Sequence, residues 1–219
     1  MNLKLDNKVA LVTGGSRGIG RAIALELASE GCRVGICARN RDGLDATLAE
    51  IRDRGAEAFG TTADVSRPGE AERFVVESAG AFGEVDILVS NVGGSSGRIL
   101  EESTDEDWAK TFDLNLFHAV RATRAALPHF VKGGGGSVII ISSISGWKPA
   151  PSGAQYGCAK AAEMFLAGAL AWELGPHNVR VNTVCPGSTI FPGGGWANRR
   201  DTDPEGFGEF EKREFPTGR

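Results

Sequence analysis

The chain has 219 residues, which is enough for one large domain or two small ones. Apolar residues make up 41% of it and charged residues 24%, a composition typical of a globular protein with a sizeable core and not of a disordered one. The formal net charge of −4 leaves no positive excess for the phosphate backbone of a nucleic acid. We therefore expect no nucleic-acid partner.

The start of the chain and its cysteines indicate where the protein resides. The first residues contain no apolar signal-peptide stretch, and no run of about eighteen apolar residues occurs anywhere. We expect a soluble, cytoplasmic protein with no membrane partner. The cysteines lack CxxC spacing and share no ligand spacing with the histidines, so we predict reduced thiols, no disulfide framework and no metal site.

Short apolar runs alternate with longer helical patterns along most of the chain. The predicted strands are residues 8–13, 33–37, 56–60, 86–89, 137–141 and 179–184. The predicted helices are residues 19–30, 42–54, 69–82, 104–131 and 154–174. Because the strands are continuous apolar runs, we expect helices on both faces of a parallel sheet. The pattern predicts a single doubly wound α/β domain over residues 1–219.

The composition changes after Pro186. Residues 187–196 are rich in glycine, and residues 199–219 are dense in charges of both signs. We predict a loop and then a short amphipathic helix near residues 203–214. Residues 187–219 fit a substrate loop that closes as a lid, and they fit a solvated surface helix equally well.

A glycine-rich turn, Thr13-Gly14-Gly15-Ser16-Arg17-Gly18-Ile19-Gly20, joins the first predicted strand to the first predicted helix. Glycines let the backbone approach a pyrophosphate, and the N-terminus of the helix offers it N–H groups and a positive dipole end. The candidate contacts in this turn are Gly14, Ser16, Arg17, Gly18, Ile19 and Gly20. A plain tight turn is the alternative interpretation.

Tyr156 and Lys160 are four residues apart in one predicted helix, so their side chains share a face. An ammonium beside a phenol favours the phenolate and lowers the phenol pKa from about 10 toward neutral pH. The pair is therefore a candidate proton donor. The alternative is a surface tyrosine beside a solvated lysine.

The turn and five later segments resemble the short-chain dehydrogenase/reductase family, in particular its 3-oxoacyl-carrier-protein reductase-like members. The later segments are Ser90-Asn91-Val92-Gly93, Asn115 between two leucines, Ser142-Ser143, Tyr156 with Lys160, and Asn182 with Pro186-Gly187. The family usually has Asn-Asn-Ala-Gly at the first of these. The resemblance implies a Rossmann-like fold and hydride transfer between a nicotinamide cofactor and a carbonyl or secondary alcohol.

The resemblance also implies roles for individual residues. Tyr156 would be the general acid or base, and Ser143 would hydrogen-bond the substrate oxygen. Lys160 would hold the nicotinamide ribose, and Asn115 would support a proton path to Lys160. Further cofactor contacts implied are Asp64, Val65, Asn91, Gly93, Pro186, Gly187 and Thr189, with Tyr156 and Lys160. From the residues alone, Ser143 could equally be a capping hydroxyl and Asn115 a satisfied helix amide.

The choice between NAD(H) and NADP(H) depends on charge at the end of the second strand. An acidic residue there accepts a hydrogen bond from the ribose 2′-hydroxyl, whereas a 2′-phosphate requires a cation. The resemblance to the family implies that the acidic position falls at Ala38, which is followed by Arg39, and Arg17 adds a second cation. We predict NADP(H) in preference to NAD(H), with Asn40 and Arg41 as helpers. The alternative is that these arginines merely lie in a solvated loop.

The substrate side and the end of the chain are less specific. Candidate substrate-side residues are 94–98, Trp147, Pro151, Gln155 and 188–196, and they do not select among small-molecule carbonyl substrates. Family members usually continue into a further helix and strand, so we expect a truncated chain. We expect a homo-oligomer, a dimer or tetramer, which this truncation would weaken. The alternative function is a catalytically weak cofactor-binding or interaction protein.

Overall fold

The computed structural model describes residues 3–97, 99–149 and 153–215. It forms two compact units, Met1–Cys185 and Pro186–Arg219, and each is described here by itself. The first unit contains the sheet and the helices that cover it, and the second contains two short helices. That residues 186–219 belong to the same domain as the sheet stays a prediction.

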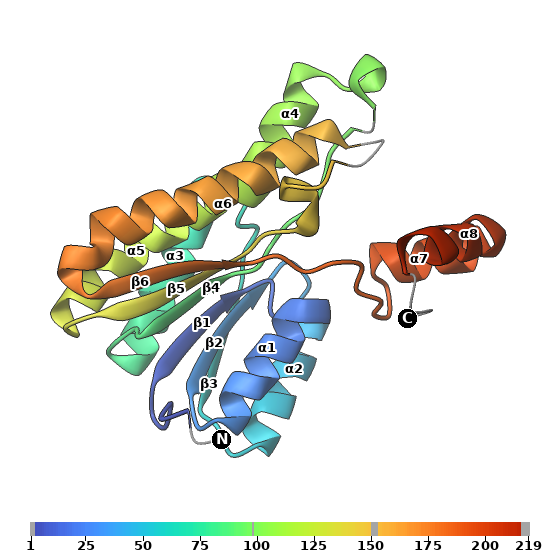
Figure 1. The fold of residues 1–219 in the computed structure, drawn as a ribbon. Coiled ribbons are helices and arrows are strands. Elements are labelled where there is room, and N and C mark those ends of the chain that lie inside the picture. The colour runs from blue at the N-terminus through green and yellow to red at the C-terminus, as the bar shows by residue number, and fades with distance from the viewer. Residues whose placement is uncertain (1–2, 98, 150–152, 216–219) are drawn as a thin grey trace. The chain divides into compact units, whose positions relative to one another are not determined.

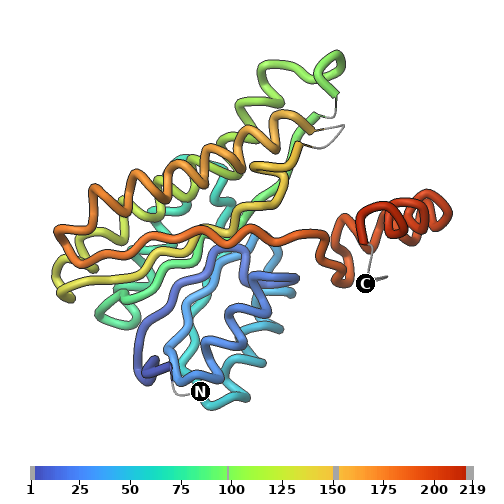
Figure 2. Tube along the Cα trace, in the orientation of Figure 1, coloured from blue at the N-terminus to red at the C-terminus, as the bar shows by residue number. Residues whose placement is uncertain are grey.

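Six parallel strands form the sheet in the order β3-β2-β1-β4-β5-β6. They are β1 (Val9–Thr13), β2 (Arg33–Ala38), β3 (Ala58–Thr62), β4 (Ile87–Ser90), β5 (Gly136–Ile141) and β6 (Val179–Val184). The chain builds one half of the sheet outward from β1 and then the other half outward from β4, as the colours in Figure 2 show. The order reverses between β1 and β4, so their carboxyl ends flank the crevice where ligands bind in open α/β sheets.

Helices cover both faces of the sheet (Figure 1). One face carries α1 (Gly18–Ser29) and α2 (Arg41–Asp53), and the other carries α3 (Glu70–Phe82), α5 (His118–Lys132) and α6 (Ala154–Leu174). Successive residues of β1 enter opposite cores. Val9 and Leu11 pack with α3 and α5, whereas Ala10 and Val12 pack with α1 and α2. Burial on both sides explains the continuous apolar runs and confirms the predicted doubly wound α/β class.

The helix predicted over residues 104–131 is interrupted, which corrects that prediction. It consists of α4 (Asp105–Phe112), a π-helical turn (Asp113–Phe117) and α5. Thr104 and Asp107 form a capping box that starts α4. The wider π-helical turn contains Asn115, one of the predicted site residues. Single π-turns of this kind are frequent at functional sites.

The second unit consists of α7 (Gly195–Thr202) and α8 (Pro204–Glu214). The second of these confirms the helix predicted near residues 203–214, but α7 begins within the predicted loop. An aromatic cluster joins the two helices: the ring centroids of Trp196 and Phe210 lie 4.6 Å apart, and Arg199 lies 5.0 Å from the Phe210 centroid. Within the described parts of the chain, no helix is long and apolar enough to cross a membrane.

Candidate active site

The glycine-rich turn lies at the carboxyl end of β1 and leads into α1. Gly14 has a φ of +68°, and a Cβ on it would lie 2.8 Å from Cγ2 of Val92. A Cβ on Gly20 would overlap the carbonyl oxygen of Gly14. Ser16 and Arg17 lie in the turn, and Gly18 and Ile19 begin α1, whose first turn contains no acidic residue. The turn therefore fits the predicted pyrophosphate contact.

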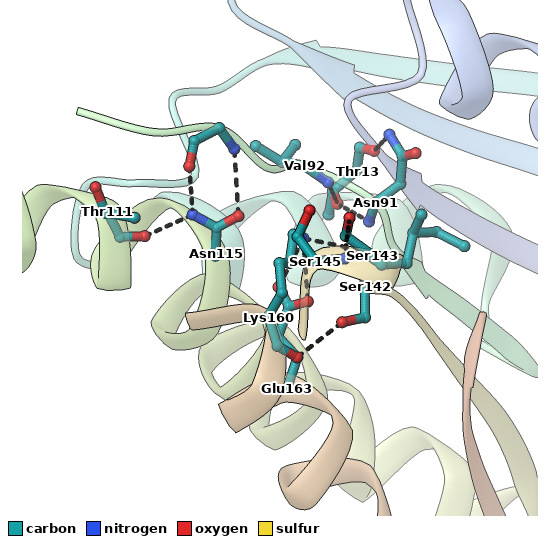
Figure 3. A network of polar contacts seen from close by, with 12 residues as sticks. Thr13, Asn91, Val92, Thr111, Asn115, Ser142, Ser143, Ser145, Lys160 and Glu163 are labelled. Carbon is teal, nitrogen blue, oxygen red and sulfur yellow. Dashed lines mark hydrogen bonds and ion pairs between the residues drawn. The ribbon is translucent and has the colours of Figure 1, made fainter. Parts of the chain in front are cut away.

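Asn91 ties this turn to the end of β4. Its backbone N–H donates to Oγ1 of Thr13 at 2.9 Å, and its Nδ2 donates to the carbonyl oxygen of Thr13 at 2.9 Å (Figure 3). Nδ2 also lies 3.4 Å from the carbonyl oxygen of Gly14. Asn91 therefore holds the two strands at the switch point together. Its predicted cofactor contact stays a prediction.

The residues predicted to choose the cofactor follow β2. Ala38 is buried and Arg39 is exposed. Asn40 caps α2 by accepting from the Gly43 N–H at 2.8 Å, and Nε of Arg41 lies 2.8 Å from Oδ2 of Asp45. Among the residues described, none forms an ion pair with Arg39, so its guanidinium is available to a ligand phosphate in a way that Arg41's is not.

After β3, Asp64 and Val65 occupy a short turn. Asp64 Oδ1 accepts from Oγ of Ser66 at 2.7 Å and from its backbone N–H at 3.3 Å. Val65 is buried. Both residues therefore have a local structural role, and their predicted contact to a cofactor stays a prediction.

Asn115 is fully buried in the π-helical turn. Its Nδ2 donates to the carbonyl oxygens of Gly94 at 2.7 Å and Thr111 at 2.6 Å, and its Oδ1 accepts from the Gly94 N–H at 3.2 Å (Figure 3). The amide thus fastens the loop after β4 to the helix. The side-chain amide thus has partners for both its nitrogen and its oxygen, as the structural alternative predicted, and it lies next to Lys160.

Gly93 brings Asn115 and Lys160 together. A Cβ on Gly93 would lie 2.8 Å from Nζ of Lys160 and 2.9 Å from Oδ1 of Asn115. Only glycine therefore allows both side chains to approach this backbone without a shift. Lys160 is 2% exposed, and its Nζ donates to the carbonyl oxygen of Ile141 at 2.9 Å and to Oε1 of Glu163 at 3.0 Å.

Tyr156 and Ser143 share a hydrogen bond, and Oγ of Ser143 also accepts from the Ser145 N–H at 3.2 Å. Nζ of Lys160 lies 5.7 Å from the centroid of the Tyr156 ring. Burial raises the pKa of Tyr156 above its usual value, and the Ser143 hydrogen bond partly offsets that rise. The prediction that the pKa of Tyr156 is lowered is therefore wrong for this structure, because burial outweighs the hydrogen bond and the charge of Glu163 also raises this pKa.

The predicted substrate-side residues fall into three groups. Gln155 is buried, and its Nε2 donates to the carbonyl oxygen of Ser96 at 2.7 Å, so it supports the loop that follows β4. Trp147 is exposed. Arg98 and Pro151 lie outside the described residues. Residues 188–196 belong to the second unit, as do Pro186, Gly187 and Thr189, which were predicted to contact the cofactor, so their part in the site stays a prediction.

Two buried side chains near the site were not singled out from the sequence. Glu163 is 1% exposed and pairs with Lys160, and His118 is fully buried at the start of α5. Burial and the charge of Lys160 lower the pKa of His118 to about 3. The available signal was spacing, because each lies three residues after a candidate, Lys160 or Asn115, on an otherwise apolar helical face.

Comparisons with known proteins agree with this geometry. The model of the short chain dehydrogenase family matches residues 8–193. Dehydrogenase/reductase SDR family member 4 from Homo sapiens is 40% identical over 185 residues, which are 84% of this chain and 66% of that protein. The chain thus spans only part of the length of this relative.

Solved structures show the same similarity. L-sorbose reductase from Gluconobacter frateurii, complexed with NADPH and L-sorbose, has a TM-score of 0.89 and 32% identity, covering 97% of this chain and 82% of its own. A 7α-hydroxysteroid dehydrogenase complexed with NADH and 7-oxo glycochenodeoxycholic acid has a TM-score of 0.82 and 31% identity, covering 87% and 78%. Both have the Rossmann-like arrangement found here. By its matching segments, its sheet and its site, the chain belongs to the short chain dehydrogenase family.

Proposed function

We propose that the protein is an oxidoreductase that transfers a hydride between NADP(H) and a small carbonyl or secondary alcohol substrate. The observation that carries the proposal is the half-buried Tyr156 side chain, which is hydrogen-bonded to Ser143 and has the Lys160 ammonium 5.7 Å from its ring centroid. The nicotinamide ring, when bound, supplies or accepts the hydride. The residues of the chain then have to supply the proton and stabilise the charge on oxygen.

Tyr156 is suited to the proton transfer. Its raised pKa keeps the phenol protonated at neutral pH, so it can donate to a carbonyl oxygen during reduction. Ser143 lies within hydrogen-bond reach of the Tyr156 hydroxyl and can donate to the same substrate oxygen. Lys160 and Asn115 form the polar end of the path behind Tyr156, where they would replace the proton that Tyr156 gives up.

The preference for NADP(H) rests on this chain's own residues, because one similar structure carries NADPH and another NADH. Ala38 stands where a carboxylate would bind the 2′-hydroxyl and repel a 2′-phosphate, and Arg39 beside it is exposed and unpaired among the described residues. A guanidinium binds phosphate in a bidentate manner, which supports the proposal. Arg17, in the glycine-rich turn, is the second cation that we assign to this phosphate.

We also propose that the chain forms a homo-oligomer. Phe165 and Trp172 on α6 are 82% and 88% exposed, and large aromatic side chains at this exposure favour a protein partner. Light scattering of the purified chain would test this, and a monomer at micromolar concentration would contradict it.

The first test is turnover of a panel of ketones, aldehydes and secondary alcohols, followed by the absorbance of reduced nicotinamide with NADPH and with NADH. We expect turnover of at least one class of carbonyl and a higher kcat/KM with NADPH. In parallel, thermal unfolding should show stabilisation by about 2.7 kcal/mol at a cofactor concentration 100 times its Kd. Stabilisation by the cofactor without any turnover would contradict the proposal that the protein is an enzyme and would favour a cofactor-binding protein.

A further inference from the structure

A buried ion pair lies directly behind the proposed proton donor. Nζ of Lys160 is 3.0 Å from Oε1 and 3.0 Å from Oε2 of Glu163, and the two side chains are 2% and 1% exposed (Figure 3). Both residues lie on α6, three positions apart. A carboxylate this deeply buried is rare without a paired charge, and here the pair includes a proposed catalytic residue.

The groups that face Lys160 come from several elements. From α6 itself these are Tyr156 and Glu163, from α5 His118, and from the end of β6 Cys185. The pKa of His118, about 3, makes it neutral at working pH. Among the groups that are described around Lys160, Glu163 is therefore the one that supplies a negative charge in direct contact.

Hydrogen bonds to backbone carbonyl oxygens hold Lys160 in place. The carbonyl oxygen of Ile141, at the end of β5, accepts from Nζ at 2.9 Å, and the hydroxyl of Ser142 donates to the carbonyl oxygen of Lys160 at 2.8 Å. An ammonium has three N–H donors. Ile141 and Glu163 use two of them, which leaves one for the side where Gly93, Asn115 and Tyr156 lie.

We propose that Glu163 is a positioning residue for the reaction: its buried carboxylate keeps Lys160 protonated and directs one N–H of the ammonium toward the site of hydride transfer. This inference rests on the proposed function, since it assigns Glu163 a role in that same site. Burial alone disfavours a charged lysine, and a lysine without its proton could neither bind ribose hydroxyls as an ammonium nor return a proton to Tyr156. The burial of Lys160 lowers its pKa, and the Glu163 carboxylate opposes that effect.

A purely structural ion pair is the competing explanation. Buried pairs of this kind often stabilise a fold no better than two apolar side chains of similar volume. In that case the charge of Glu163 would be irrelevant to Lys160 chemistry. A second competing state is a neutral pair in which Glu163 carries the proton, since burial also raises the pKa of Glu163. The amide of glutamine would mimic such a protonated carboxyl closely.

The first test compares Glu163→Gln with Glu173→Gln, which makes the same change at an exposed position of the same helix. In Glu163→Gln we expect the alkaline limb of kcat/KM to move to lower pH by at least about one unit, because an adjacent opposite charge shifts a pKa by about 1–3 units. Glu173→Gln should leave the pH profile unchanged. Glu163→Asp keeps the negative charge, so its pH profile should lie close to that of the wild type. An unchanged profile in Glu163→Gln would overturn the proposal.

The second test needs no turnover. The ¹³Cε signal of Lys160, assigned as the one lost in Lys160→Met, is titrated by NMR in the wild type and in Glu163→Gln. We expect the ammonium of the wild type to stay protonated to a higher pH than that of the variant, and identical titrations would overturn the proposal. Absence of turnover in the wild type together with a shifted titration would instead contradict the proposed function alone. If Glu163→Gln does not fold, Glu163→Met, which also removes the charge and has a side chain of similar length, carries the same comparison.

Discussion

The two halves of the sheet build their parts of the site in different ways. Around β1 and β2, the site is made of backbone and glycine, and its candidate cations, such as Arg39, are exposed. Around β4, β5 and α6, it is made of buried polar side chains, Asn115, Lys160 and Glu163, each held by hydrogen bonds. We expect the first half to bind a ligand through its shape and helix dipole, and the second half to act through fixed charges in a low-dielectric interior.

This difference determines what substitutions should do. A buried charge that loses its partner costs both stability and chemistry, because water cannot reach it to compensate. An exposed cation that is lost changes only the affinity for a ligand group that it contacts. We therefore expect large, coupled effects in the α6 half and small, selective ones in the β2 half.

The largest effect should come from Tyr156→Phe. Removal of the proposed general acid should lower kcat by about 10²–10⁴-fold, while the stabilisation of the fold by NADPH stays unchanged. Since the chain contains one tyrosine, ultraviolet titration of the wild type reads its pKa directly, and we expect a value above the usual 10. Retention of more than a tenth of the wild-type kcat would contradict the assignment.

The next effect should come from breaking the ion pair. Lys160→Met leaves Glu163 buried without its cation and should lower the free energy of unfolding by about 3–5 kcal/mol. The double variant Lys160→Met/Glu163→Leu should recover most of that loss, since apolar side chains fill the same volume. Chemical denaturation of the two variants measures this. A double variant as unstable as the single one would show that packing, and not unpaired charge, limits stability here.

Acid should destabilise the same half through His118. Its pKa is about 3 in the fold and about 6.5 when unfolded, so the unfolded chain binds the proton first as pH falls. His118 then contributes a loss of up to about 1.4 kcal/mol of stability per pH unit between pH 6.5 and 3. Chemical denaturation at several pH values should show that the free energy of unfolding of His118→Leu depends less steeply on pH than that of the wild type. Equal dependence in the two proteins would contradict a buried, neutral imidazole.

The smallest effect should come from the exposed half. Arg39→Ala should weaken NADPH binding by about tenfold, the value of one charge-assisted contact, and leave NADH binding and stability unchanged. Arg41→Ala is the matched control, because Arg41 is already paired with Asp45 and should contribute less. Isothermal titration with both cofactors measures the difference. Equal loss of NADPH and NADH affinity in Arg39→Ala would argue against a 2′-phosphate contact.

Much of the fold could be predicted because local pattern and tertiary burial agree. The predicted bounds of α6 and β6 match the structure, and β1 differs by one residue. The interrupted helix was missed because the π-helical turn depends on hydrogen bonds from Asn115 to Gly94, which is distant in sequence. No periodicity in residues 104–131 encodes that contact. β3 begins and ends two residues later than predicted, and its true end was missed because Thr61 and Thr62 are polar and carry little apolar signal.

The fold class, the glycine-rich turn and the set of residues that the chemistry requires can be read from spacing and residue type, because these depend only on neighbours along the chain. The protonation and the contacts of those residues depend on the packing around them. The burial of Tyr156 raises its pKa where spacing alone predicted a lowering, and Lys160 is directed to a carboxylate that the sequence did not distinguish from a solvated one. The desolvation of a group depends on all the atoms packed around it, and these come from segments that are distant in the sequence.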